Sequence, residues 1–282
     1  MNNKTLYIIG NGFDLAHNLQ TSYRHFKFFL EQISNENISD QILSKSDAIQ
    51  LLSCLYKTKG LREDSNWNCF EESLAFLNIK SMIKTIGNNY DKWYDFDANF
   101  YEKLHTAFEC WINSIDITSE TIYDLDKNAI FLNFNYTTTL EKIYNIKKEN
   151  IIYIHSRQEK EENKVYKRLI FGHRTSKNDI KKYIDETLDP NSIFKDKITD
   201  FLSSFEKPID SEINSLEFQE LIKIMNNIST VKIIGHSLGD IDKPYFEKLL
   251  DANKNNTWIK YYPDKNLSFE RIKNLPITEI KK

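Results

Sequence analysis

The sequence predicts an α/β fold built on a mostly parallel β-sheet with helices on both faces. Short runs of residues are apolar at consecutive positions, as in strands that are buried on both sides. Amphipathic helical patterns fill the stretches between these runs, and strands that alternate with helices indicate a parallel sheet. Five of the seven glycines directly follow an apolar run, where a tight turn or the close approach of a ligand requires a residue without a side chain.

Six segments have the pattern of buried strands. They are Thr5–Ile9, Ala129–Leu132, Ile151–Ile154, Leu169–Phe171, Thr230–Ile234 and Trp258–Tyr262. Two apolar stripes at helical spacing are the clearest helices, the first behind a cap signal at Thr21 and Ser22. Their members are Tyr23, Phe26, Phe29, Leu30 and Ile33, and Leu104, Phe108, Trp111, Ile112 and Ile115.

The chain, residues 1–282, is predicted to form a single α/β domain with two large helical insertions. More than a hundred residues separate the first two predicted strands, which is far longer than one crossover connection. The first insertion is therefore expected at about residues 35–125, and a second helical stretch at about residues 178–227.

The composition suits a protein in solution in the cytoplasm. Of the 282 residues, 40% are hydrophobic and 28% charged, which supports a packed core. The net charge of −3 argues against a protein whose main role is to bind the phosphate backbone of nucleic acid. The three cysteines lack CxxC spacing and are expected to be reduced thiols. No apolar stretch approaches the roughly 18 residues of a membrane span.

The first strand leads into Gly10-Asn11-Gly12-Phe13-Asp14. A strand, Gly-x-Gly and a helix present backbone N–H groups to a phosphate in many folds. The motif is not a full dinucleotide fingerprint, because its third glycine is missing, and no Gly-Lys-Ser/Thr of a P-loop follows. A structural turn explains the glycines equally well, whereas Asn11 and Asp14 favour a binding site.

Polar residues also follow the next predicted strands. Asn135, Tyr136 and Thr137 belong to a polar cluster that is larger than helix capping requires. His155 and His173 each end a further predicted strand. Ligands of open α/β sheets bind at this edge, and neutral imidazole is the natural general base near pH 7. We therefore expect these five residues to line a ligand site.

The last motif is Gly235-His236-Ser237-Leu238-Gly239-Asp240. Its form is that of the nucleophile elbow of an α/β hydrolase, with Ser237 as nucleophile. In that fold the catalytic histidine follows the serine, whereas all six histidines here precede Ser237. We therefore expect another strand-end turn, which offers Ser237 and Asp240 to a ligand.

Metal binding has little support, because the histidines are dispersed and no HExxH motif or Cys/His pairing occurs. In the first insertion, Glu71 and Glu72 follow Trp67 and suit the start of a helix. Alternatively, Glu71 would point into the site.

Together these motifs resemble the AbiH family of phage abortive-infection proteins. The matching pieces extend, in order, over nearly the whole chain. They are Ile9–His17, Thr21–Tyr23, Phe26, Trp67, Phe70, Glu71, Asn135–Thr138, Ile154, His155, Gly172, His173, Gly235–Leu238 and Asp242. The resemblance implies a role in anti-phage defence, and we expect a homo-oligomer or a phage-derived trigger.

The order of the motifs also resembles, more distantly, the sirtuin-like NAD-cleaving domains of bacterial defence proteins. Those domains use an Asn after one strand and a His after the next, which correspond to Asn135 and His155. The resemblance implies a Rossmann-like (sirtuin-like) sheet and NAD as substrate, with no separate cofactor. Thr137 and Ser156 depart from the usual Asp and Gly of these domains, and the first loop lacks Gly-Ala-Gly.

The predicted function is hydrolysis of the nicotinamide glycosidic bond of NAD. Asn135 would orient the ribose and the water, His155 would act as base, and the loop Gly10–Gly12 would hold the diphosphate. Asp14 or Glu71 would stabilise the cationic sugar. The other expected binding residues are Tyr136, Thr137, His173, Gly235, His236, Ser237 and Asp240. Two alternatives stay open, a nucleotide sensor without turnover and a nuclease-type toxin.

Overall fold

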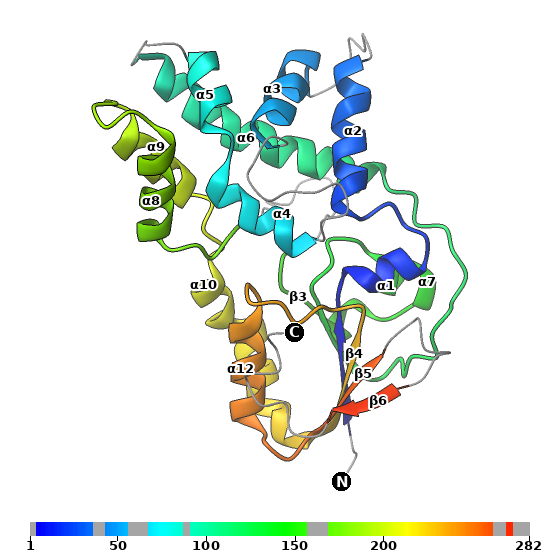
Figure 1. Cartoon of the computed structure of the whole chain (residues 1–282). Coiled ribbons are helices and arrows are strands. Elements are labelled where there is room, and N and C mark those ends of the chain that lie inside the picture. The colour runs from blue at the N-terminus through cyan, green and yellow to red at the C-terminus, as the bar shows by residue number, and fades with distance from the viewer. Residues whose placement is uncertain are drawn as a thin grey trace. The chain divides into compact units, whose positions relative to one another are not determined.

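The computed structural model describes residues 4–35, 43–55, 67–86, 91–156, 169–261 and 269–272 (Figure 1). The chain divides into two compact units. The α/β unit comprises Met1–Thr21, Ile115–Ile170 and Pro208–Lys282, and the helical unit comprises Ser22–Ser114 and Phe171–Lys207.

The α/β unit contains a six-stranded sheet in the order β3-β2-β1-β4-β5-β6. The first five strands in this order are parallel, and β6 pairs antiparallel with β5. The strands are β1 (Lys4–Ile9), β2 (Ile130–Asn133), β3 (Ile151–Tyr153), β4 (Ile228–Ile234), β5 (Thr257–Tyr261) and β6 (Phe269–Ile272). The strand order reverses between β1 and β4, as in Rossmann-like sheets, which confirms the predicted fold class.

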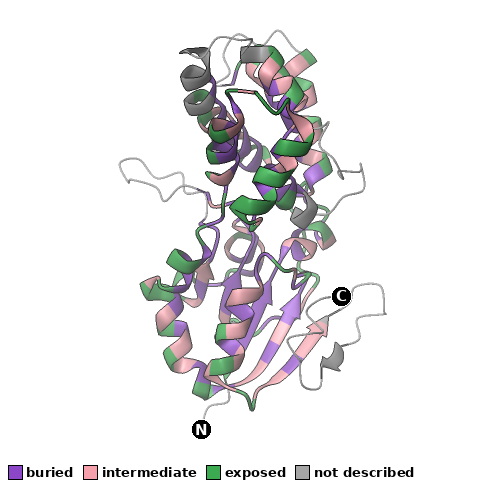
Figure 2. Ribbon diagram, turned by 60° about the vertical axis from the view of Figure 1, so that its left-hand side comes forward, coloured by how far each residue is buried: buried purple, intermediate pink, exposed green. Residues whose placement is uncertain are grey.

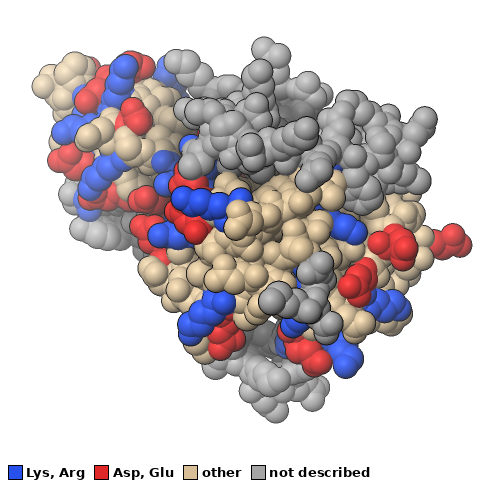
Figure 3. Space-filling model, turned by 90° about the horizontal axis from the view of Figure 1, so that it is seen from below, with Lys and Arg blue, Asp and Glu red and all other residues tan. Residues whose placement is uncertain are grey.

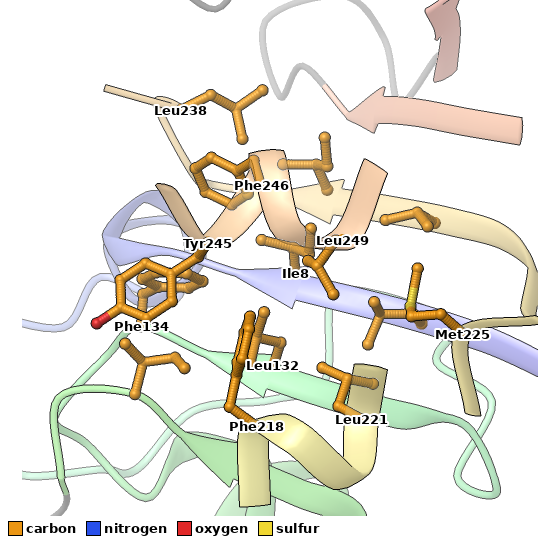
Figure 4. Close-up of a cluster of buried hydrophobic side chains, with 14 of the residues drawn as sticks. Ile8, Leu132, Phe134, Phe218, Leu221, Met225, Leu238, Tyr245, Phe246 and Leu249 are labelled. Carbon is orange, nitrogen blue, oxygen red and sulfur yellow. The ribbon is translucent and has the colours of Figure 1, made fainter. Parts of the chain in front are cut away.

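Helices cover both faces of this sheet because its strands are apolar on both sides. Along β1, Leu6 and Ile8 belong to one buried cluster, and Tyr7 and Ile9 belong to another. Figure 4 shows the first cluster, where α12 and α11 pack on the sheet. Helices α1 and α7 cover the opposite face. The helices of this unit are α1 (Asn11–Ala16), α7 (Thr139–Tyr144), α10 (Ile209–Ile213), α11 (Leu216–Ile224) and α12 (Lys243–Ala252).

The central strands end at the same level. Ile9 at the end of β1 is in register with Asn133 of β2 and Ile234 of β4, and Asn133 is in register with Tyr153 of β3. The segments that follow these strands therefore begin side by side at one edge of the sheet. Figure 2 shows that the central strands are largely buried.

The helical unit is built around aromatic side chains. Phe26 of α2 contacts Phe108 and Trp111 of α6, with ring centroids 5.6 and 5.2 Å apart, and Phe100 contacts Phe201 of α9 at 5.7 Å. The first predicted apolar stripe lies on α2, and the second lies on α6 except for Ile115, which follows the last helical residue, Ser114. Ser22 caps α2 by accepting the N–H of His25. The helices are α2 (Tyr23–Asn35), α3 (Lys45–Leu55), α4 (Trp67–Ser73), α5 (Ile79–Ile86), α6 (Asp91–Ser114), α8 (Lys177–Thr187) and α9 (Lys195–Ser203).

One predicted strand is wrong. Leu169–Phe171 forms no strand of the sheet. The N–H of Ile170 donates to the carbonyl of His155, and at Phe171 the chain passes into the helical unit. Leu169 and Phe171 are apolar because they are buried, at 3% and 6% exposure, and not because they pair in the sheet.

The segments of the helical unit overlap the two predicted helical insertions. The first extends over Ser22–Ser114 and the second over Phe171–Lys207, where about 35–125 and 178–227 were expected. The second ends early because α11 packs its buried Phe218 and Leu221 on the sheet of the α/β unit.

In the described part of the chain, no helix is long and apolar enough to cross a membrane. On the face shown in Figure 3, Lys and Arg side chains are interspersed with Asp and Glu.

Candidate functional site

The imidazole of His155, just after β3, is held in one orientation by the backbone. Its Nδ1 lies 3.0 Å from the carbonyl oxygen of Phe134. A carbonyl can only accept a hydrogen bond, so Nδ1 carries a proton. In the neutral ring Nε2 therefore has the lone pair of a base. The rings of Phe134 and Tyr136 enclose this imidazole, with centroids 5.5 and 5.6 Å away.

Asp242 connects His155 with a second histidine. Its Oδ1 lies 3.5 Å from Nε2 of His155, and its Oδ2 lies 3.5 Å from Nε2 of His236. Nδ1 of His236 accepts the backbone N–H of Leu238 at 2.9 Å, so neutral His236 carries its proton on Nε2, beside the carboxylate. All three side chains are buried. A proton taken up at Nε2 of His155 would therefore lie next to the carboxylate of Asp242.

The fold brings these residues together from distant strands. Asp242 follows β4 and His155 follows β3, so their contact extends past the ends of β1 and β2. Asp242 precedes α12, but its side chain makes no capping hydrogen bond with that helix. The carboxylate is directed to the histidines instead, and the nearby helix N-terminus favours its negative charge.

Two histidines and a carboxylate can form a metal site, but the tautomer of His236 argues against one. Because Nδ1 of His236 accepts an N–H, its Nε2 is protonated in the neutral ring and offers no lone pair to a metal. Among the described residues, no group of three or more His, Cys, Asp or Glu side chains is arranged to hold a metal ion.

Asp14 forms hydrogen bonds that link the segment after β1 to the segment after β2. Its carboxylate accepts hydrogen bonds from the hydroxyls of Thr137 at 2.6 Å and Thr139 at 2.8 Å. Beside it, Nδ2 of Asn135 donates to the carbonyl of Gly10 at 3.1 Å. Burial raises the pKa of Asp14 to about 6, against the lowering effect of hydrogen bonds from both threonines and Asn135. Asp14 and Thr137 therefore position Asn135, and Oδ1 of Asn135 is its remaining acceptor.

The glycines after β1 pack against the loop after β4. The N–H of Gly10 donates to Ile234 O at 3.0 Å and that of Gly12 to Gly235 O at 2.8 Å. A Cβ on Gly10 would lie 2.6 Å from Cα of His236, and one on Gly12 would lie 2.8 Å from Cα of Gly235, whose φ is +69°. Close contact between two backbones explains these glycines. A phosphate held here would need donors other than these two N–H groups.

The far end of the loop after β4 is exposed. Ser237 and Asp240 are both on the surface, and Nζ of Lys260 lies 3.5 Å from the carbonyl of Ser237. Helix α12 begins only at Lys243, so Ser237 does not occupy the strand-to-helix elbow of an α/β hydrolase. Burial lowers the pKa of Lys260.

Two predicted candidates belong to the helical unit. His173 is fully buried there, with Nδ1 accepting the N–H of Thr175 and Nε2 donating to Leu202 O at 2.8 Å. Both ring nitrogens are therefore hydrogen-bonded within the helical unit. Burial lowers the pKa of His173. Glu71 forms a buried ion pair with Lys207 at 3.0 Å. The side chain of Trp67 lies outside the described part of the structure.

A family model described as bacteriophage abortive infection AbiH matches residues 6–262. This chain belongs to the AbiH family. The match confirms the predicted family, and it includes every segment that contributes to the site of this AbiH protein. Neither the comparison with curated proteins nor that with solved structures gave a match.

Asp242 and Lys260 are residues of the candidate site for which the sequence alone predicted no role. Asp242 was part of the family resemblance, and an acid two residues after the Gly-His-Ser-Leu-Gly-Asp motif was the signal available. Only the fold reveals its contact with His155. Lys260 lies near the end of β5 among many other lysines, so nothing in the sequence distinguishes it.

Proposed function

We propose that this AbiH protein hydrolyses the N-glycosidic bond between nicotinamide and ribose in NAD. The observation that carries the proposal is the buried pair of His155 and Asp242 at 3.5 Å, at the carboxyl edge of the sheet. Open α/β sheets bind ligands at this edge, and Rossmann-like sheets bind nucleotides where the strand order reverses.

The residues supply the proton chemistry of this reaction. The bond between C1′ and the nicotinamide nitrogen breaks, nicotinamide leaves with the bonding electrons, and a water oxygen bonds to C1′. The products are nicotinamide, ADP-ribose and one proton. Nε2 of His155 accepts that proton from the water, and the charge of Asp242 stabilises the imidazolium. The leaving group needs no acid, because the pyridinium nitrogen becomes neutral as it departs.

Other side chains at this edge would bind the substrate. Oδ1 of Asn135 would accept a hydrogen bond from the ribose or the water, because its Nδ2 is bound to Gly10 O. Ser237 and Asp240 would contact the adenosine half, and the charge of Lys260 beside Ser237 would offset the diphosphate. Asp242, and not Asp14 or Glu71, would be the carboxylate nearest the reacting centre.

The family role is compatible with this reaction. The description of the AbiH family is bacteriophage abortive infection. Loss of NAD would stop the metabolism on which phage growth depends. A homo-oligomer or a phage-derived trigger would then control when the site turns over.

The test is nicotinamide release from NAD by the purified full-length protein, measured by chromatography. Wild type is expected to release nicotinamide and ADP-ribose in equal amounts. His155→Gln should lower the rate by about 10²- to 10⁴-fold. His25→Gln is the matched control, since His25 is a half-buried histidine of α2 that bonds Ser22. NAD recovered intact but bound would favour a nucleotide sensor instead.

A further inference from the structure

Four described residues other than glycine have a positive φ, and three of them have an ordinary explanation. They are Asn18, Asn145, Ser156 and Leu238. Asparagine tolerates this region of backbone space, and Asn145 ends α7 there. Leu238 buries its side chain in the apolar cluster of Figure 4, and its N–H binds His236. Burial and that hydrogen bond offset its backbone strain.

Ser156 has no such compensation. Its φ is +62°, a conformation that favours glycine, and its side chain is only 6% exposed. Its Oγ is buried and has no hydrogen-bond partner among the residues that the structure describes. A strained backbone and an unsatisfied buried hydroxyl both oppose folding, and nothing in the described structure uses that hydroxyl. A strained backbone together with an unpaired buried hydroxyl at one residue is typical of a functional position.

Ser156 lies next to the proposed base, His155. It directly follows His155, whose carbonyl accepts the N–H of Ile170 at 2.9 Å. The hydroxyl of Tyr136 donates to the carbonyl of Ile170 at 2.8 Å, so the segment around Ser156 is fixed by its neighbours. The hydroxyl is thus held in place next to the proposed base.

We propose that Ser156 binds the ligand, with its hydroxyl hydrogen-bonded to a ribose hydroxyl of the nucleotide. A serine hydroxyl both donates and accepts, as a sugar hydroxyl does. The ribose is the part of the substrate that lies at His155 if that residue acts at C1′. The inference therefore rests on the proposed function for the identity of the ligand.

The test combines stability with binding in the full-length protein. Ser156→Ala removes the hydroxyl and keeps Cβ, and Ser156→Gly also removes the strain. ADP-ribose serves as the probe, so that no turnover is needed. We expect Tm to stay unchanged or rise in both variants, while the Kd for ADP-ribose increases about three- to tenfold. Ser203→Ala is the control: Ser203 Oγ donates to Thr199 O at 2.7 Å within α9 of the helical unit, so this variant should keep the wild-type affinity.

A lower Tm for Ser156→Ala would overturn the inference, because the hydroxyl would then support the fold. Unchanged affinity in both variants would overturn it as well, and so would a wild-type protein that does not bind ADP-ribose. Wild type that binds ADP-ribose without releasing nicotinamide from NAD would overturn only the proposed reaction. The two failures are therefore distinguishable.

Discussion

Nε2 of His155 lies 3.5 Å from Oδ1 of Asp242, although the two residues follow strands at different positions of the sheet. Because Nδ1 of His155 donates to Phe134 O, Nε2 is the only ring nitrogen that can exchange a proton with a ligand. The carboxylate beside it would stabilise the positive charge of a protonated imidazole.

The two histidines at Asp242 are expected to have opposite tautomers. His236 should be unprotonated at Nδ1, where it accepts the N–H of Leu238, whereas neutral His155 should be protonated there. NMR correlation of ring carbons and nitrogens in ¹⁵N-histidine-labelled protein distinguishes the two states. His17 is an internal reference for the Nδ1–H tautomer, because its Nδ1 donates to Phe13 O at 2.7 Å. An Nδ1–H signal from His236 would contradict the described site.

Asp14 should make stability depend on pH. Burial raises its pKa from 3.8 to about 6, so protonation favours the folded state. This stabilisation is complete below about pH 4 and is lost as the pH rises to about 6, which amounts to about 3 kcal/mol. Asp14→Asn removes this titration. The free energy of unfolding of Asp14→Asn minus that of wild type should therefore be greater at pH 7.5 than at pH 4 by about that amount.

Urea unfolding at the two pH values measures the effect of Asp14. Asp251→Asn, at an exposed position of α12, is the matched control for an Asp-to-Asn change outside the buried site. An equal difference between Asp14→Asn and wild type at both pH values would refute the described burial of this carboxyl.

Gly12 should be required for folding and not only for ligand binding. A Cβ there would lie 2.8 Å from Cα of Gly235, and backbone atoms cannot move aside easily. Gly12→Ala should therefore cost about 1–3 kcal/mol in the absence of any nucleotide. Leu15→Ala in the same short helix is the control, because Leu15 is 40% exposed. A Gly12→Ala protein of wild-type stability that bound nucleotide poorly would instead restore the phosphate-cradle interpretation.

The ion pair between Lys207 and Glu71 should stabilise the helical unit only as a pair. Their side chains are 0% and 1% exposed. Lys207→Met leaves a buried carboxylate without its 3.0 Å cation, which should cost about 3–5 kcal/mol. Adding Glu71→Leu should recover most of this loss. Thermal unfolding of the single and double variants measures both effects, and a double variant as unstable as Lys207→Met would argue against the pairing.

The fold class could be predicted from the sequence because buried parallel strands are apolar on both sides. The predicted segments at Thr5, Ala129, Ile151, Thr230 and Trp258 each coincide with a strand to within two residues. Leu169–Phe171 has the same composition and is not a strand, since burial between other elements produces the same pattern. The edge strand β6 was not predicted, because its sequence Phe-Glu-Arg-Ile has too few apolar residues.

The site could be predicted in part. Polar residues at strand ends indicated the edge of the sheet, and the structure brings Asn135, His155 and His236 to the same end of the α/β unit. The sequence could not reveal that Asp242 faces both histidines, because that contact depends on how α12 packs. It also could not distinguish glycines that contact another backbone from glycines that approach a phosphate.

The rate of nicotinamide release from NAD by Asp242→Asn tests whether the pair of His155 and Asp242 takes part in the reaction. This change keeps the size of the side chain and removes the charge beside His155. We expect a loss of about 100-fold or more in kcat at an unchanged Tm, because a charge at 3.5 Å in a buried site is worth a few kcal/mol. Asp251→Asn should retain the wild-type rate. A rate for Asp242→Asn equal to wild type would show that the pair takes no part in the reaction.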